Sequence, residues 1–106
     1  MEKKVIPGQL VESRSGRDSG RVYLVMEVVD DKYVLVADGV MRRVENPKKK
    51  NVKHLIVHPQ VAEEIAAKLS SGGHVTNPEL QQAVQRLAEA VVKEVGLLSN
   101  VRQGCH

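Results

Sequence analysis

The stretch SGRDSGRVYLVMEVVDDKYVLVADG, residues 15–39, decides the fold of this chain. It holds two apolar, β-branched runs, Val22–Val29 and Tyr33–Ala37, whose composition favours strands over helices. The glycines that precede the first run, Gly16 and Gly20, can adopt the positive φ of tight turns. Polar residues 30–32 connect the two runs. We therefore expect short strands joined by tight turns.

The flanking residues extend this β-structure in both directions. Toward the N-terminus, Leu10–Ser13 predicts a short first strand. Toward the C-terminus, Asp38-Gly39 stands between two apolar runs, which is the preferred composition of a two-residue type I′ hairpin. Such a turn would pair Ala37 with Val40 and Val36 with Met41, and would open a fourth strand.

Two further signals complete the predicted sheet. Asn46-Pro47 ends the fourth strand, because proline cannot donate to a strand ladder. Val52–His58 then predicts a fifth strand. Five short strands with tight turns predict a small SH3-like β-barrel over residues 1–58.

A helical period replaces the β pattern after Pro59. Ser70–Gly73 separates two helices, and the second begins with Asn77 as N-cap and Pro78 at the first helical position. Gly96 is expected to end it. The apolar stripes of the two helices are Val61, Ile65 and Leu69, then Leu80, Val84, Leu87, Val91 and Val95. The predicted fold is thus mainly β with α, a barrel followed by a two-helix extension over residues 59–106.

Positive charge is concentrated in the predicted barrel. Residues 1–58 contain twelve Lys and Arg against eight Asp and Glu, whereas residues 59–106 contain four against five. The densest cluster is RRVENPKKKNVK, residues 42–53, with six cations opposed only by Glu45. Such an asymmetry indicates an anionic polymer as the partner, although a lysine run can also be a solvated loop that protects an edge strand.

The segment GQLVESRSGRDSGRVYLVMEVVD, residues 8–30, resembles the KOW motif, with Gly20 at the position of the motif glycine. The following YVLVADG and KKKNVKHL resemble the KOW barrels of the archaeal and eukaryotic large-subunit ribosomal protein fourteen-e family and their short bacterial relatives. The resemblance covers residues 5–57 and leaves the helical extension unplaced.

The resemblance implies an SH3-like barrel that binds structured RNA, rRNA above all, in a ribosome or translation setting. The KOW loop and the neighbouring basic loops would contact the RNA. The residues so implicated are Arg14, Gly16, Arg17, Gly20, Arg21, Arg42, Arg43, Lys48, Lys49, Lys50 and Lys53.

The composition favours recognition of RNA shape and backbone over reading of single bases. Proteins that read single strands stack bases on aromatic side chains, and here Tyr23 and Tyr33 are the only aromatic residues. Ribosomal proteins are a second class of expected partner. The alternative function is a protein–protein adapter that uses the barrel or the C-terminal helices, and a monomer is expected over a dimer.

Other function classes find little support in the sequence. We expect no enzyme, because no nucleophile with a base and no paired carboxylates stand out, and SGRDSG joins two strands rather than a strand and a helix. We expect no cofactor and no metal, because His54 and His58 lie on a predicted strand and lack partners at metal-ligand spacing. The single cysteine, Cys105, and the absence of a membrane-length apolar run suit the cytoplasm.

Overall fold

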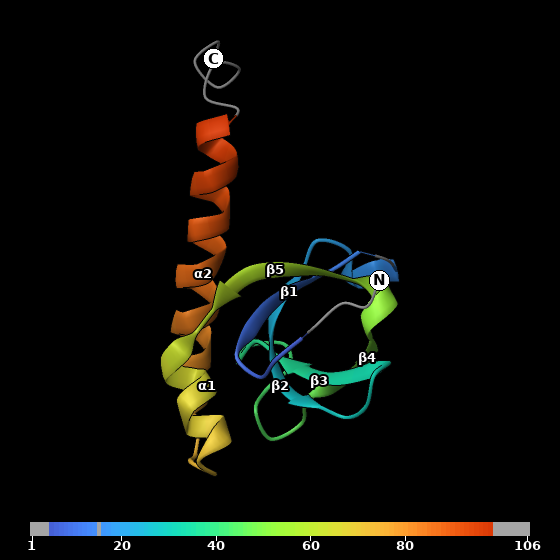
Figure 1. Ribbon diagram of the computed structural model, residues 1–106, viewed down its shortest axis with the longest axis vertical. Coiled ribbons are helices and arrows are strands. Elements are labelled where there is room, and N and C mark those ends of the chain that lie inside the picture. The colour runs from blue at the N-terminus through green and yellow to red at the C-terminus, as the bar shows by residue number, and fades with distance from the viewer. Residues whose placement is uncertain (1–4, 15, 99–106) are drawn as a thin grey trace.

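The computed structural model describes residues 5–14 and 16–98 (Figure 1). Residues 99–106, Cys105 included, lie outside this range. In order along the chain, the elements are β1 (Gln9–Ser13), the 3₁₀ turn η1 (Gly16–Asp18), β2 (Val22–Val28), β3 (Tyr33–Ala37), β4 (Lys48–Asn51), the 3₁₀ turn η2 (Val52–His54), β5 (Leu55–Val61), α1 (Glu63–Ser70) and α2 (Asn77–Leu98).

The five strands form one antiparallel sheet in the order β4-β3-β2-β1-β5. Strand composition therefore predicted the first three strands correctly, to within a residue at each end. The sheet curls strongly, and α1 and α2 lie together along one side of it (Figure 1). The predicted closed barrel is not confirmed, because the strand order leaves β4 and β5 as the two edges. The architecture is a mixed α/β fold, a five-stranded antiparallel sheet with two helices.

The predicted hairpin at Asp38-Gly39 is wrong. Asp38 Oδ1 accepts hydrogen bonds from the backbone N–H groups of Val40 and Arg42, both at 2.9 Å, and the N–H groups of Asp38 and Gly39 donate to the Arg42 carbonyl. These bonds close residues 38–42 into a local loop instead of a two-residue turn. On this side of β3 the ladder begins with Val36 opposite Lys48, and Ala37 is paired only on the other side, with Leu24 of β2.

The fourth strand instead falls within the lysine run that we expected to be a loop. Lys48–Asn51 forms β4 and pairs with β3, so that Val36 lies opposite Lys48 rather than Met41. Lysine and asparagine favour strands weakly, and the pairing with the apolar β3 overrides that preference. The basic cluster therefore lies partly on an edge strand.

The predicted fifth strand begins three residues early. Residues 52–54 form η2, whose first turn is capped by the Asn51 side chain accepting from the N–H of Lys53 at 3.0 Å. The strand β5 then continues through Pro59 to Val61. Proline is tolerated there because β5 is an edge strand, so that along one of its two edges no neighbouring strand needs the missing N–H group.

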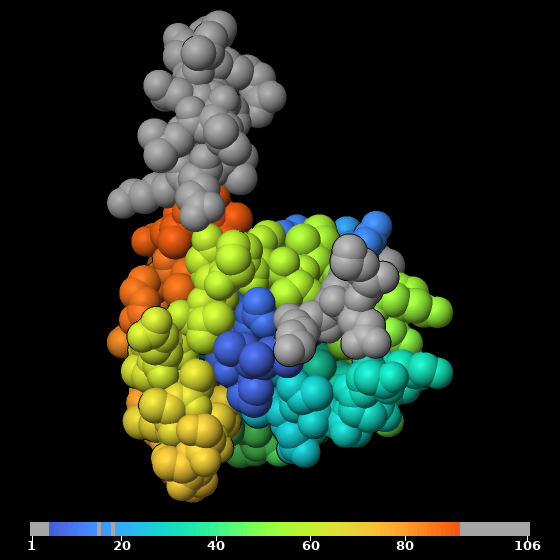
Figure 2. Space-filling model, in the orientation of Figure 1, coloured from blue at the N-terminus to red at the C-terminus, as the bar shows by residue number. Residues whose placement is uncertain are grey.

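Two apolar clusters hold the fold together. The first lies between the sheet and the helices and joins Leu10 and Leu24 to Ile65, Leu80 and Leu87. The second lies within the curl of the sheet and is made of Val11, Tyr23, Val25, Val34, Val36, Val52 and Leu55. Of the predicted helical stripes, Ile65, Leu80, Val84 and Leu87 are buried in the first cluster, and Leu69 and Val91 pack against it. Val61 instead lies in β5, and the side chain of Val95 is outside the described part of the structure. Figure 2 shows the helices packed closely against β5.

The helix α2 starts with Thr76 as its cap, not Asn77 as predicted. Thr76 Oγ1 accepts from the Glu79 N–H, and Glu79 Oε1 accepts from the Thr76 N–H at 3.0 Å, which is the reciprocal pattern of a capping box. Gly96 does not end the helix, which continues to Leu98. The Asn77 side chain is used elsewhere, as described below.

An ion pair between Lys68 of α1 and Glu79 of α2 couples the two helices. The hydrogen bond from Lys68, together with the Thr76 N–H, lowers the pKa of Glu79 from 4.5 to about 2. Because its pKa is lowered on folding, Glu79 stabilises the folded protein at pH values above 4.5, and this contribution is lost as the pH falls from 4.5 toward 2.

We expect urea unfolding at pH 6, 4 and 3 to show that the wild type has a larger free energy of unfolding than Glu79→Gln, and that this difference shrinks as the pH falls. An advantage independent of pH would contradict the coupling.

Candidate nucleic-acid interface

The loop between β1 and β2 is held beside η2 by backbone hydrogen bonds. Ser13 N donates to the Arg21 carbonyl and Gly20 N donates to the Ser13 carbonyl, both at 2.8 Å, which closes the base of the loop. Arg14 N donates to the His54 carbonyl at 3.0 Å. Arg14, at the base of this loop, is thereby placed beside η2, which also carries Lys53, while Arg21 lies across the base of the loop from Ser13.

The two glycines of this loop have the backbone conformations that the sequence suggested. Gly16 has a φ of 74° and Gly20 a φ of 91°, a region that favours glycine. A Cβ atom built on either residue meets no atom within 4 Å. The loop backbone therefore borders open space, and a phosphate could approach it closely.

The three lysines of β4 do not share one surface. Lys48 and Lys50 lie opposite Val36 and Val34, which are fully buried, whereas Lys49 lies opposite Leu35 on the other side of the sheet. The three ammonium groups are consequently divided between two sides.

Contacts of the individual side chains follow this division. Lys50 Nζ donates to Ser13 Oγ at 3.2 Å, so that it reaches the end of β1 beside Arg14. Lys49 Nζ lies 4.6 Å from the ring centroid of Tyr33 and belongs to a different surface. Within the predicted lysine patch, Lys50 is therefore tied to the base of the β1–β2 loop.

Arg42 and Arg43 belong to a loop, residues 38–47, that is docked on the start of α2. Asn77 makes most of this contact: its Oδ1 accepts from the Val44 N–H at 2.8 Å and its Nδ2 donates to Glu45 at 2.9 Å. This amide hydrogen bond also lowers the pKa of Glu45. Arg43 is exposed and Arg42 is half-buried.

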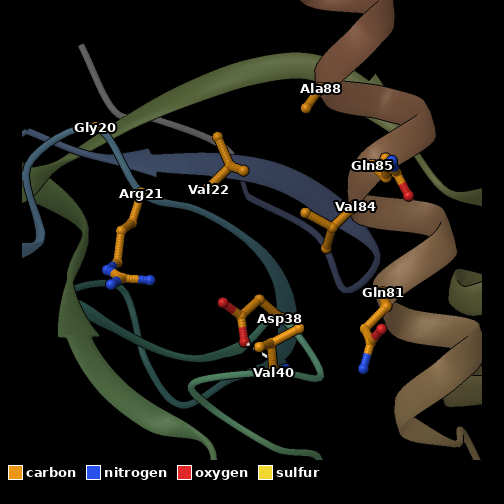
Figure 3. A pocket seen from close by; sticks show the side chains of 9 residues that line it. All are labelled: Gly20, Arg21, Val22, Asp38, Val40, Gln81, Val84, Gln85 and Ala88. Atoms are coloured by element: carbon orange, nitrogen blue, oxygen red, sulfur yellow. Dashed lines mark hydrogen bonds between the residues drawn. The ribbon is translucent and has the colours of Figure 1, made fainter.

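A pocket of about 410 Å³ joins the two regions (Figure 3). The start of β2 contributes Arg21 and Val22, the loop contributes Asp38 and Val40, and α2 contributes its face at residues 81–88. Figure 3 shows the Arg21 side chain extending toward the loop that carries Asp38. Among the predicted residues, Gly20 and Arg21 line this pocket.

Sequence reasoning missed the remaining lining residues. Asp38 was interpreted only as part of a turn, and Gln81 and Gln85 were not considered as site residues. The spacing of Gln81, Gln85 and Ala88 does place them on one helix face, and this was the available signal. No local pattern shows that this face lies across from Arg21.

Among the described residues, cations without an ion pair lie in the loops of the sheet and in η2, whereas the cations named below on the helices are paired. Within residues 5–14 and 16–98, Lys68 and Arg86 form ion pairs with Glu79 and Glu64. The structure gives no ion pair with another described residue to Arg14, Arg17, Arg21, Arg42 or Lys53. These five cations remain available for an anionic ligand.

The described part of the chain offers no group of three or more His, Cys, Asp or Glu side chains placed to hold a metal ion. His58 Nε2 lies 3.1 Å from Glu12 Oε1, and this pair links β5 to β1. None of the helices in the described range has the length and apolar character that a bilayer span requires.

Fold and site together define a small α/β protein in which a curled antiparallel sheet presents unpaired cations beside a helix-lined pocket. No protein-family model matches the chain, so the KOW motif stays a prediction. The chain is 34% identical over 70 residues to the Bacillus subtilis (strain 168) protein named "Putative ribosome-binding protein YbzG". The match covers 66% of this chain and 95% of that relative. This chain belongs to the YbzG family.

Proposed function

We infer that this protein binds structured RNA, rRNA in particular, and that it does so as a non-catalytic component of a ribosome or translation assembly in the cytoplasm. The observation that carries the proposal is the cluster of unpaired cations around the base of the β1–β2 loop. The similarity to YbzG, a protein named as a putative ribosome-binding protein, supports the ribosomal setting. The curled sheet suits an SH3-like barrel of the KOW class.

The chemistry of the cluster suits phosphate binding. Arg14, Arg17 and Lys53 are exposed, and the loop glycines leave room for the RNA backbone. Arginine adds bidentate contact with a phosphate, which fixes orientation as well as charge. The scarcity of aromatic side chains favours folded RNA over single strands, because Tyr23 is buried in the core.

A second function, a protein–protein adapter, is favoured by one observation. Val40 and Met41, at the tip of the loop docked on α2, are 61% and 63% exposed. Exposed apolar side chains of this kind suit a protein contact. A groove for Pro-rich peptides is not part of this alternative, because such grooves are lined by aromatic residues.

Sedimentation through a sucrose gradient separates the two functions. We expect the protein to migrate with ribosomes in low salt and to be released as the salt rises, because phosphate contacts are screened and displaced by cations. Nuclease treatment before a pull-down should also release its partners. Partners that survive both high salt and nuclease would favour the adapter and count against RNA binding.

A further inference from the structure

The pocket beside Arg21 combines three kinds of group that a nucleotide needs. Val22 and Val84 provide apolar surface from β2 and α2, and Figure 3 shows both side chains in the space between strand and helix. Arg21 provides an exposed cation without an ion pair among the described residues. Asp38 provides a carboxylate at the opposite side. A volume of about 410 Å³ leaves room for one base with its sugar.

The carboxylate of Asp38 is held in place by the loop that it closes. Its Oδ1 accepts the N–H groups of Val40 and Arg42, while Figure 3 shows its other oxygen directed away from Val40. Gln81 donates to the Gly39 carbonyl at 2.9 Å and so fixes the same loop to α2. The second oxygen of Asp38 is thus a preorganised acceptor on the rim of the pocket.

We propose that this pocket binds one unpaired guanine nucleotide of the RNA. Guanine is the RNA base whose Watson–Crick edge carries two adjacent donors, N1–H and N2–H, and a carboxylate accepts from such an edge. The base would lie on the apolar surface that Val22 and Val84 contribute to the pocket, and Arg21 would bind the phosphate of the same nucleotide. Bases that are unpaired in loops and bulges are the ones that proteins read in this manner.

The position of the pocket connects this inference to the cation cluster. Gly20 and Arg21 belong both to the pocket lining and to the base of the β1–β2 loop. An RNA helix bound by the exposed cations could therefore place a bulged nucleotide in the pocket without leaving them. The inference rests on the proposed function and adds a base preference to it.

The test compares RNA hairpins that are identical except for one bulged nucleotide, with a fully paired hairpin as reference. We expect the bulged guanine to bind about tenfold more tightly than the paired hairpin, the size of one good base contact. Bulged adenine, cytosine and uracil should bind nearly as the paired hairpin does. Failure to bind the paired hairpin would refute the proposed function, whereas equal binding of all four bulges would overturn only the pocket assignment.

Two variants locate the effect. Asp38→Asn keeps an oxygen for Val40 and Arg42 but replaces the second oxygen with a donor, and should abolish the guanine preference while paired-hairpin affinity stays unchanged. Ala88→Leu should fill the pocket with a larger side chain, and should also abolish the guanine preference without changing the affinity for the paired hairpin. A preference that persists in both variants would overturn the proposal. So would an Ala88→Leu protein that keeps the preference but no longer sediments with ribosomes, because the pocket would then receive a protein.

Discussion

Replacing Arg14 and Lys53 together with glutamine is expected to weaken binding to a structured rRNA fragment strongly and to flatten its salt dependence. Both side chains are exposed and lack ion pairs among the described residues, so their removal costs the fold little. Each phosphate contact contributes about −0.7 to −0.9 to the slope of log K against log salt concentration, so two lost contacts should reduce the slope by about 1.5. Filter binding from 50 to 200 mM salt, about the range over which such contacts are displaced, measures both quantities.

A matched control separates a local contact from net charge. Ala67→Glu with Gln82→Glu lowers the net charge by the same two units, from +3 to +1, at exposed positions on α1 and α2. This control should bind almost as the wild type does, with an unchanged salt slope. Equal losses in the two double variants would show that the RNA responds to overall charge, and the cation cluster would then have no special role.

Replacing Gly39 with alanine is expected to destabilise the protein by about 3 kcal/mol, from the cost of a positive φ in a residue with a Cβ plus the cost of an overpacked contact. Gly39 has a φ of 82°, and a Cβ built on it would lie 2.5 Å from the Asn77 carbonyl oxygen and 3.1 Å from the Gln81 nitrogen. Both atoms belong to the backbone of α2, so the steric clash can be relieved only if the loop moves away from the helix. Equilibrium unfolding in urea, followed by circular dichroism, measures the loss.

Gly72→Ala is the control for this variant. Gly72 has a similar φ of 77°, but a Cβ there would meet no atom within 4 Å. It should therefore show the conformational cost alone, about 1 kcal/mol. Similar losses in the two variants would mean that the contact between the loop and α2 contributes little to stability.

The features that the sequence predicted well are those encoded by local pattern. Strand composition identified the first three strands, and helical spacing identified Ile65, Leu80 and Leu87 as core residues. The cap of α2 was also encoded locally, since TNPE is a capping-box pattern, but the preference for asparagine as a cap led to the wrong residue. Asn77 instead binds a loop more than thirty positions away, and no local rule predicts that choice.

The errors came from contacts that are distant in sequence. Asp38-Gly39 has the composition of a hairpin turn, yet the closure of the loop by the Asp38 carboxylate and the close approach of α2 to Gly39 determine its shape. Lysines 48–50 were predicted to form a loop because lysine is uncommon in strands. In the structure they pair with β3 and form β4. The pocket could not be predicted either, because Arg21, Asp38 and Gln85 are distant in sequence and line one pocket only in the folded chain.

The place of the β4 lysines at an edge of the sheet has a practical consequence for handling this protein. An edge strand can act as a template for another chain, and charged side chains on it discourage such stacking into fibres or precipitates. Acetylating or neutralising these lysines would remove that protection. The same change would also remove positive charge that the protein offers to RNA. Loss of binding in such a sample would be confounded by insolubility, so the solubility of the preparation has to be measured first.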